Sequence, residues 1–192
     1  MIAIIKYNAG NIGSVQNALD RLGYESVITD DAQEILSADK VIFPGVGHAG
    51  RAMDHLRKKG LDKVIKEITT PFLGICLGLQ LMCRLSEEGN TECLGIYDAE
   101  VKRFPNDEIV PHMGWHEIYL SDTELLKDLS KDPDLYFVHS YFAEVSEDTI
   151  AVSKYGQKFS AAMQKGNFYA TQFHPEKSAS VGEKILKNFL AL

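Results

Sequence analysis

Short strand patterns alternate with helical patterns through the first half of this chain, and no other feature of the sequence restricts the fold as strongly. Apolar side chains recur at helical spacing over 11–22, and Gly23 then suits a helix terminus. The helical pattern returns over 49–68, with a break near Gly60, and again over 77–85. Strands are predicted between these segments, at 2–7, 24–28, 40–43 and 72–75.

Strands that alternate with helices form βαβ units, which require a mostly parallel sheet covered by helices on both faces. The second half differs, because closely spaced strand patterns joined by turn residues predict antiparallel hairpins there. We therefore expect an α/β fold in one domain spanning 1–192. The later strands are predicted at 100–104, 115–120, 135–138, 149–155, 159–164 and 168–173, before a closing helix near 181–190.

Composition excludes several classes of function. A net charge of −7 argues against a nucleic-acid or anionic-membrane surface. No apolar run approaches the roughly 18 residues of a membrane span, and the first residues lead directly into a strand pattern. Cys76, Cys83 and Cys93 have no paired or metal-binding spacing, which indicates a reduced, cytoplasmic protein without a metal. No phosphate-cradling glycine motif is present, and we expect no cofactor.

A cysteine stands between two glycines where a predicted strand turns into a helix. In Gly74-Ile75-Cys76-Leu77-Gly78 this is the nucleophile-elbow pattern, with cysteine in place of serine. The glycines leave room for a sharp, strained turn, and the following helix directs its positive end at Cys76, which favours the reactive thiolate. The Leu77 amide is then a natural oxyanion donor. The alternative is a structural cysteine beside closely packed glycines.

A base with a partner follows the last predicted strand. His174 is the usual type of base for a thiol, and Glu176 can fix its orientation. In an extended segment the two side chains point the same way, and Pro175 stiffens the geometry. The alternative is an ordinary surface loop. Because sites in open α/β sheets lie at the carboxyl ends of strands, the fold can bring His174 to Cys76.

Two further segments reach the same predicted edge of the sheet. Gly45, Val46 and Gly47 follow the third strand and can offer backbone amides, Val46 above all, to an oxyanion. The alternative is a plain turn. Gln80 lies one helical turn after Cys76, on the same face, and can bond a substrate unless it is merely solvated.

Together, Gly74-Ile75-Cys76-Leu77-Gly78-Leu79-Gln80 and Gln172-Phe173-His174-Pro175-Glu176 resemble the class I, triad-type glutamine amidotransferases. The resemblance implies that family's flavodoxin-like fold. It also implies that Cys76, His174 and Glu176 form a catalytic triad, which makes a glutamyl thioester, releases ammonia and yields glutamate.

Other motifs resemble one branch of the family, the glutaminase subunits of imidazole glycerol phosphate synthase (the HisH type) in histidine biosynthesis. These motifs are Pro44-Gly45-Val46-Gly47-His48, Pro111-His112-Met113-Gly114-Trp115, Tyr136-Phe137-Val138-His139-Ser140-Tyr141 and His174-Pro175-Glu176-Lys177-Ser178. The resemblance implies that Gly45–Gly47 is an oxyanion strand held unproductive until a partner binds its ligand. It implies that glutamine is bound by Gln80 and by the backbone of His139, Ser140 and Tyr141.

The same resemblance implies a heterodimer with a cyclase subunit of the HisF type, a (β/α)₈ barrel. Asn11, Met113 and Trp115 would line the interface, although Trp115 can also be a core residue. Ammonia would pass through the barrel to a phosphorylated ribulose-type substrate, giving imidazole glycerol phosphate and an aminoimidazole carboxamide ribotide.

One residue departs from this pattern, since His116 stands where the family usually has asparagine. This leaves open a homologous subunit that feeds another acceptor, such as an enzyme that amidates surface sugars. A glutaminase of pyridoxal phosphate synthesis typically has a Gly-Gly-Glu-Ser oxyanion segment, which Gly45-Val46-Gly47 does not match. A stand-alone cysteine hydrolase would not need Gln80, and a regulatory subunit with a dead site would lack a triad member.

Overall fold

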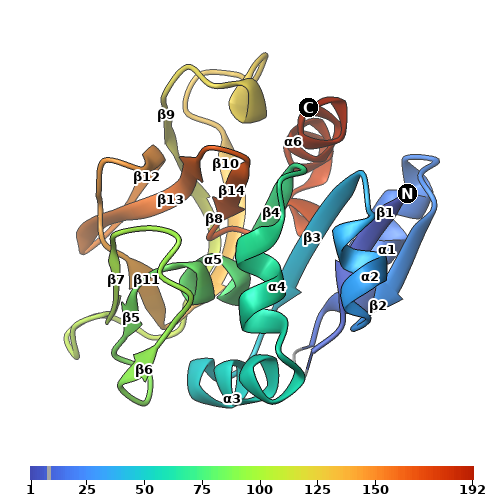
Figure 1. Ribbon diagram of the computed structural model, residues 1–192. Helices are drawn as coiled ribbons and strands as arrows, with labels where there is room; N and C mark the ends of the chain where they lie inside the picture. Colours follow the sequence, from blue (N-terminus) through green and yellow to red (C-terminus); the bar gives the residue numbers. More distant parts are fainter. Residues whose placement is uncertain (8–9) are drawn as a thin grey trace.

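The computed structural model describes residues 1–7 and 10–192, and its centre is an eight-stranded sheet in the order β2-β1-β3-β4-β14-β13-β12-β9 (Figure 1). The first five of these strands are parallel and the last three pair antiparallel. The expected α/β fold, parallel in its first half and antiparallel in its second, is confirmed. The strands of this sheet are β1 (Ile2–Ile5), β2 (Ser26–Thr29), β3 (Lys40–Gly45), β4 (Phe72–Cys76), β9 (Tyr119–Leu120), β12 (Thr149–Tyr155), β13 (Gln157–Lys165) and β14 (Phe168–Thr171).

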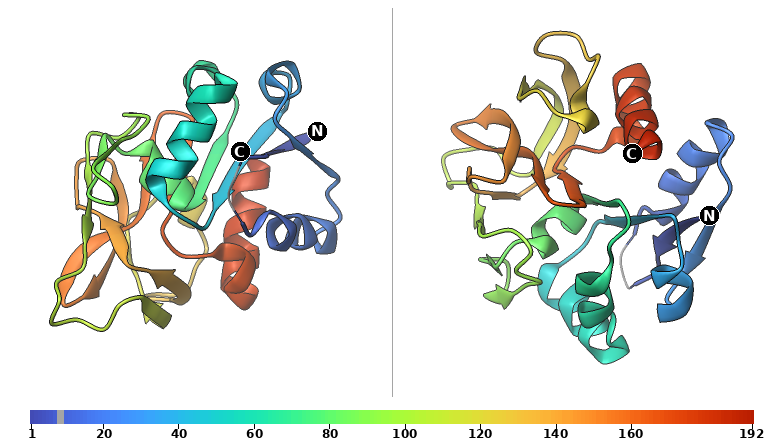
Figure 2. Two further views of the ribbon diagram at one scale, coloured as in Figure 1. Left: turned by 90° about the horizontal axis from the view of Figure 1, so that it is seen from below. Right: turned by 45° about the horizontal axis from the view of Figure 1, so that its top comes forward.

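Helices cover both faces of this sheet, as βαβ connections require (Figure 2). One face carries α1 (Ile12–Arg21) and α6 (Ala179–Ala191). The opposite face carries α2 (Ala32–Leu36), α3 (Ala49–Lys59), α4 (Leu61–Glu67) and α5 (Leu77–Met82). Each face encloses its own apolar core, so the inner parallel strands β1, β3 and β4 are buried from both sides.

Two small sheets complete the second half. One pairs β8 (His112–Glu117) with β10 (Asp134–His139), and the other joins β11 (Tyr141–Ala143), β7 (Glu100–Arg103), β5 (Leu85–Ser86) and β6 (Thr91–Glu92). The single strand predicted at 115–120 is wrong. Ile118 is buried in the core and separates β8 from β9. Strand β8 pairs with β10 in a small sheet, whereas β9 pairs with β12 in the large sheet.

Helix ends follow from local chemistry. Gly60 adopts a left-handed conformation (φ 70°) between α3 and α4, which is the predicted break. The Asp31 carboxylate accepts from the Gln33 and Glu34 amides and starts α2, a helix that the sequence pattern did not reveal. Helix α5 ends at Met82, earlier than expected, because Cys83 is extended and the chain enters β5. Two short 3₁₀ turns, Glu124–Leu126 and Pro175–Lys177, lie in the second half.

Helix α5 lies unusually close to β3, and Gly78 makes this possible. A Cβ added at Gly78 would come within 2.0 Å of the Phe43 carbonyl oxygen, which is backbone and cannot move aside cheaply. The start of α5, which follows Cys76 directly, is therefore held against the carboxyl end of β3.

We predict that Gly78→Ala lowers the free energy of unfolding by about 2–4 kcal/mol, because the methyl group must push α5 off β3. Gly13→Ala is the matched control, since a Cβ at this exposed position in α1 meets nothing within 4 Å. The control should stabilise the protein by roughly 0.5–1 kcal/mol. Urea unfolding measures both changes, and equal stability of the two variants would contradict this packing.

Candidate active site

The carboxyl ends of three neighbouring parallel strands bring the predicted site segments together. Gly45 at the end of β3 lies opposite Cys76 at the end of β4, and Ile75 lies opposite Thr171 at the end of β14. Residues 172–176 continue directly from β14. The three segments that sequence reasoning placed at one sheet edge are therefore adjacent in the fold.

The backbone at Cys76 is strained in the way an elbow requires. Its φ is 55° and its ψ is −106°, a conformation that non-glycine residues rarely adopt. The turn is possible only with small neighbours. A Cβ at Gly74 would lie 2.5 Å from the Met82 sulfur, which is too close for the present packing. It would also lie 3.0 Å from the Gly78 carbonyl carbon, at the limit of the distances that real Cβ atoms show. The strain holds the Cys76 side chain at the sheet edge, where the thiol is buried and forms no disulfide.

His174 and Glu176 form a buried pair. The Nδ1 atom of His174 lies 2.7 Å from Oε1 of Glu176, and neither side chain is exposed to solvent. The prediction that an extended segment brings the two side chains together is wrong, because residues 175–177 form a 3₁₀ turn. The turn still folds the carboxylate back onto the ring. Since Nδ1 is engaged, Nε2 is the ring nitrogen left to act on the thiol, and it makes no geometric hydrogen bond to a described residue.

Asn11 joins this pair from the other end of the chain. Its Nδ2 atom donates to Oε1 of Glu176 at 2.5 Å and lies 3.3 Å from Nδ1 of His174. Asn11 itself has a left-handed backbone (φ 74°) at the start of α1, which asparagine tolerates better than most residues. A residue predicted to lie at a partner interface thus contacts the candidate triad directly.

Electrostatics at His174 favour the charged ring. Burial alone would lower its pKa, but the negative charge of a facing Cys76 sulfur and the hydrogen bond with the Glu176 carboxylate outweigh burial and raise the pKa to about 10. An imidazolium beside a cysteine is the arrangement that supports a thiolate nucleophile.

A cavity of about 140 Å³ opens beside Cys76. It is lined by every residue predicted to bind glutamine, and by Val46, Gly47 and Leu77 from the predicted oxyanion segments. Gly45 is buried just behind it, next to Cys76. The lining residues are Val46, Gly47, Cys76, Leu77, Gln80, Glu88, Val138, His139, Ser140 and Tyr141.

Two members of this region were missed or misjudged from sequence. Glu88 lines the cavity and also caps α3, with Oε2 accepting from the Ala49 amide at 2.6 Å. No pattern in the sequence distinguishes Glu88 from the neighbouring Glu87. Gln80 is not a solvated helix residue, since its Nε2 donates to the Tyr141 carbonyl (2.8 Å) and to Oε1 of Gln172 (3.0 Å).

Histidines support the far wall of the cavity. The Nδ1 atom of His139 lies 2.7 Å from the Tyr141 carbonyl, and its Nε2 lies 3.0 Å from Nδ1 of His112. Burial lowers the pKa of His139 to about 3 and that of His112 to about 4, so both rings are neutral near pH 7. The unusual His116 packs edge-on against His112, with ring centroids 4.1 Å apart, on the outer side of this pair.

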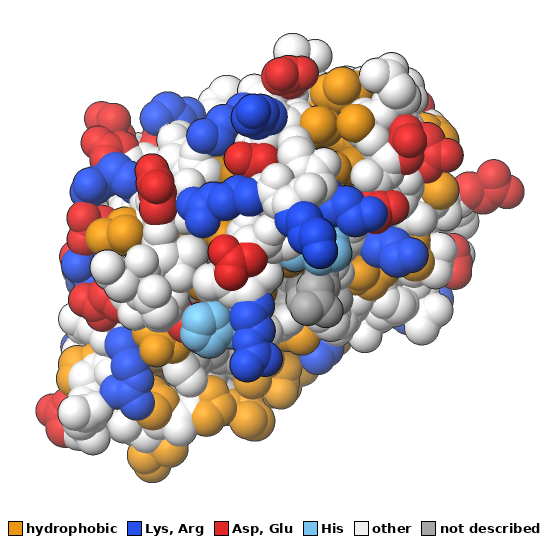
Figure 3. Space-filling view, turned by 60° about the horizontal axis from the view of Figure 1, so that its bottom comes forward, with side chains coloured by type: hydrophobic (Ala, Val, Ile, Leu, Met, Phe, Trp, Pro, Cys, Tyr) orange, Lys and Arg blue, Asp and Glu red, His pale blue; other side chains and the backbone are white. Residues whose placement is uncertain are grey.

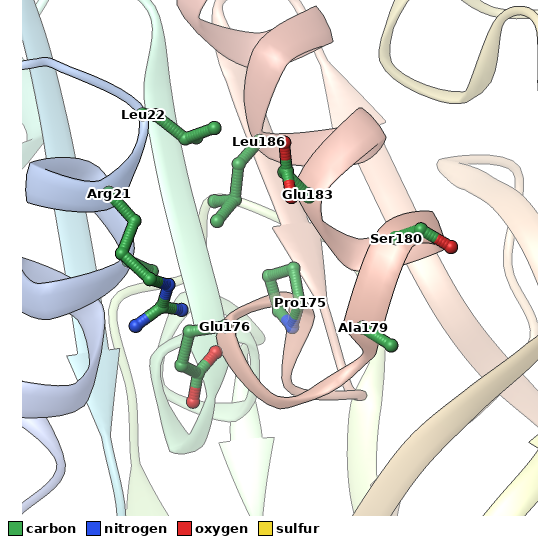
Figure 4. Close-up of a pocket in the computed structure, with 9 residues that line it drawn as sticks. Arg21, Leu22, Pro175, Glu176, Ala179, Ser180, Glu183 and Leu186 are labelled. Atoms are coloured by element: carbon green, nitrogen blue, oxygen red, sulfur yellow. The ribbon is translucent and has the colours of Figure 1, made fainter.

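A second cavity, of about 300 Å³, lies behind Glu176 between α1 and α6 (Figure 4). Arg21 extends along it from α1, and Glu183 and Ser180 border it from α6. Oε2 of Glu176 has no hydrogen-bond partner among the described residues. This cavity is separate from the one beside Cys76, which shares none of its lining residues.

Met113 and Trp115 lie on the outer face of β8 and are 59% and 51% exposed. Trp115 is therefore not a core residue. Its ring packs edge-on against Tyr136 of the paired strand β10. On the face shown in Figure 3, basic and acidic side chains are interspersed, without a large field of one sign.

Within 1–7 and 10–192, no group of three or more His, Cys, Asp or Glu side chains is arranged to hold a metal ion. Over the same residues, no helix combines the length and apolar character needed to cross a membrane.

Comparison with known families agrees with this geometry. The family model described as Glutamine amidotransferase class-I matches residues 3–192. The chain therefore belongs to the class I glutamine amidotransferases and is an enzyme of that class. A crystal structure of a glutamine amidotransferase has the same fold, with a TM-score of 0.76 at 18% identity over 99% of this chain and 97% of that one.

Curated relatives identify the branch. The chain is 59% identical to the imidazole glycerol phosphate synthase subunit HisH of Bacteroides fragilis strain YCH46, over 100% of this chain and 99% of that protein. It is 45% identical to the subunit of the same name from Idiomarina loihiensis, over 100% of this chain and 97% of that protein. Within the class, the chain belongs to the HisH subunit family.

Proposed function

We propose that this chain is the glutaminase subunit of imidazole glycerol phosphate synthase, acting through Cys76, His174 and Glu176. The observation that carries the proposal is the buried His174–Glu176 pair together with a strained cysteine that lines a cavity of about 140 Å³. The whole chain would act as one domain, a proposal supported by the family match over 3–192.

Glutamine fits the cavity by charge and by hydrogen bonding. The Glu88 carboxylate suits the α-ammonium group, and it is the acidic side chain among the lining residues. The backbone of His139, Ser140 and Tyr141 offers polar groups along the opposite wall, and Gln80 holds the Tyr141 carbonyl in place. The side-chain amide of glutamine would then lie against Cys76.

The first half-reaction forms a thioester. The Cys76 thiolate attacks the amide carbon of glutamine, and the amides of Val46 and Leu77 would stabilise the negative oxygen. The protonated ring of His174 gives its Nε2 proton to the amide nitrogen, the C–N bond breaks and ammonia leaves. Glu176 and Asn11 hold the ring while its charge changes.

The second half-reaction restores the enzyme. Neutral His174 takes a proton from water, and the resulting hydroxide attacks the thioester carbon. The C–S bond breaks, glutamate leaves, and the thiolate faces an imidazolium again. One glutamine and one water thus give one glutamate and one ammonia.

The ammonia would go to a partner. The HisH relatives are named as subunits of imidazole glycerol phosphate synthase. We propose that this cytoplasmic chain likewise forms a heterodimer with a (β/α)₈ cyclase subunit of the HisF type. Exposed Met113 and Trp115 supply an apolar docking face of the kind that dominates binding energy. Asn11 would link that interface to the triad.

We predict that Cys76→Ala abolishes ammonia release from glutamine in the complete complex while leaving the affinity for the cyclase subunit unchanged. Cys83→Ala is the control, since this buried thiol lies just after α5, donates to the Leu79 carbonyl and does not line the cavity beside Cys76. It should retain ammonia release. A coupled glutamate dehydrogenase assay measures both, and hydrolysis by Cys76→Ala would remove this residue from the mechanism.

We also predict that Trp115→Ala weakens association with the cyclase subunit by about 2 kcal/mol, or roughly thirtyfold in Kd, because a large exposed aromatic anchor is lost. Tyr24→Ala is the matched control, because Tyr24 is also an exposed aromatic residue. It lies next to β2, the edge strand of the large sheet opposite β9, whereas Trp115 lies on β8 in a separate two-stranded sheet. Calorimetric titration should find the control unchanged. If Trp115→Ala binds as tightly as the parent, β8 is not the docking face.

A further inference from the structure

Gln172 is a fully buried polar residue that the mechanism above does not use. It lies between β14 and His174, and its backbone amide donates to the Ala161 carbonyl at 2.8 Å, which fixes its position. Its side chain points at the nucleophile, with Nε2 3.6 Å from the Cys76 sulfur. That distance is a hydrogen-bond length for a sulfur acceptor.

Gln80 determines which end of the Gln172 side chain faces the sulfur. Nε2 of Gln80 donates both to Oε1 of Gln172 (3.0 Å) and to the Tyr141 carbonyl (2.8 Å). If the Gln172 amide were reversed, two NH₂ groups would face each other, and a carbonyl oxygen would face the sulfur. The network therefore selects the orientation in which an N–H points at Cys76.

The strength of this hydrogen bond depends on the charge of the Cys76 sulfur. A neutral thiol is a weak acceptor, whereas a thiolate accepts a charge-assisted hydrogen bond. Cys76 is almost fully buried, so water screens this difference only weakly. An N–H held at this position favours the thiolate over the thiol.

We propose that Gln172 is a hydrogen-bond donor to the Cys76 thiolate, held in orientation by Gln80. This inference rests on the proposed role of Cys76 as the nucleophile. It adds a neutral donor to the charged partner, His174, and it gives Gln80 a positioning role besides lining the cavity.

Other groups near the sulfur must be held constant in any test. His174 faces Cys76 from the turn after β14, with Glu176 behind it. Tyr7 is buried beyond the end of β1, and the proximity of Cys76 is one cause of its raised pKa. Glu88 shares the cavity from the loop between β5 and β6. None of these groups changes in the variants below.

The test is the rate of Cys76 alkylation by iodoacetamide as a function of pH, measured on the full chain by peptide mass spectrometry. Gln172→Met keeps the length of the side chain and removes the donor. We expect the midpoint of its pH profile to rise by about one pH unit, because a hydrogen bond to a charged group is lost. Gln172→Glu places an acceptor at the sulfur and should raise the midpoint further.

The control is Gln164→Met on β13, a half-buried glutamine that is remote from the sulfur in the described contacts. It should leave the midpoint unchanged. Cys83 and Cys93 do not interfere, because burial raises the pKa of the Cys93 thiol to about 12 and that of Cys83 still further.

A purely structural glutamine predicts another result. Loss of packing alone would lower the thermal stability of Gln172→Met and leave the midpoint where the parent has it, and that outcome overturns the proposal. If Gln172→Met does not fold, the same comparison is made with Gln172→Glu and with Gln80→Met, which frees the Gln172 amide to rotate. A parent Cys76 that resists iodoacetamide would instead count against the proposed function.

Discussion

The strained backbone at Cys76 is the constraint on which the site depends. A φ of 55° is costly for a residue with a side chain, and it persists because the flanking glycines allow α5 to lie directly on β3 and β4. The Gly78 approach to the Phe43 carbonyl is the tightest part of this packing. The sulfur is thereby fixed at the sheet edge, where neighbouring strands deliver the remaining groups.

Those groups come from distant parts of the chain and meet in two buried hydrogen-bond networks. One network contains Asn11, His174 and Glu176, and it sets the orientation of the proposed base. The other contains Gln80 and Gln172, and it reaches the Cys76 sulfur. One network therefore reaches the His174 ring and the other reaches the Cys76 sulfur, which are the two groups that the proposed mechanism brings together.

The sequence was sufficient for the strands of the parallel half and for the segments that carry the site, because glycine spacing, strand patterns and the carboxyl-edge rule are local signals. It was insufficient where a role depends on contacts between remote residues. Asn11 reaches Glu176 across 165 positions, and nothing in its own segment indicates this. Glu88 and the burial of Gln80 were hidden for the same reason, as was the division of 115–120 between two sheets.

The central claim is that glutamine is cleaved through a covalent bond to Cys76, and trapping that bond tests it most directly. The complex would be treated with an electrophilic glutamine analogue, and ammonia release and the mass of each cysteine peptide would be followed together. The account predicts one adduct, on the Cys76 peptide, that forms in step with the loss of activity and is prevented by excess glutamine. Full inactivation with an unmodified Cys76 peptide, or ammonia release that continues after Cys76 is fully labelled, would contradict it.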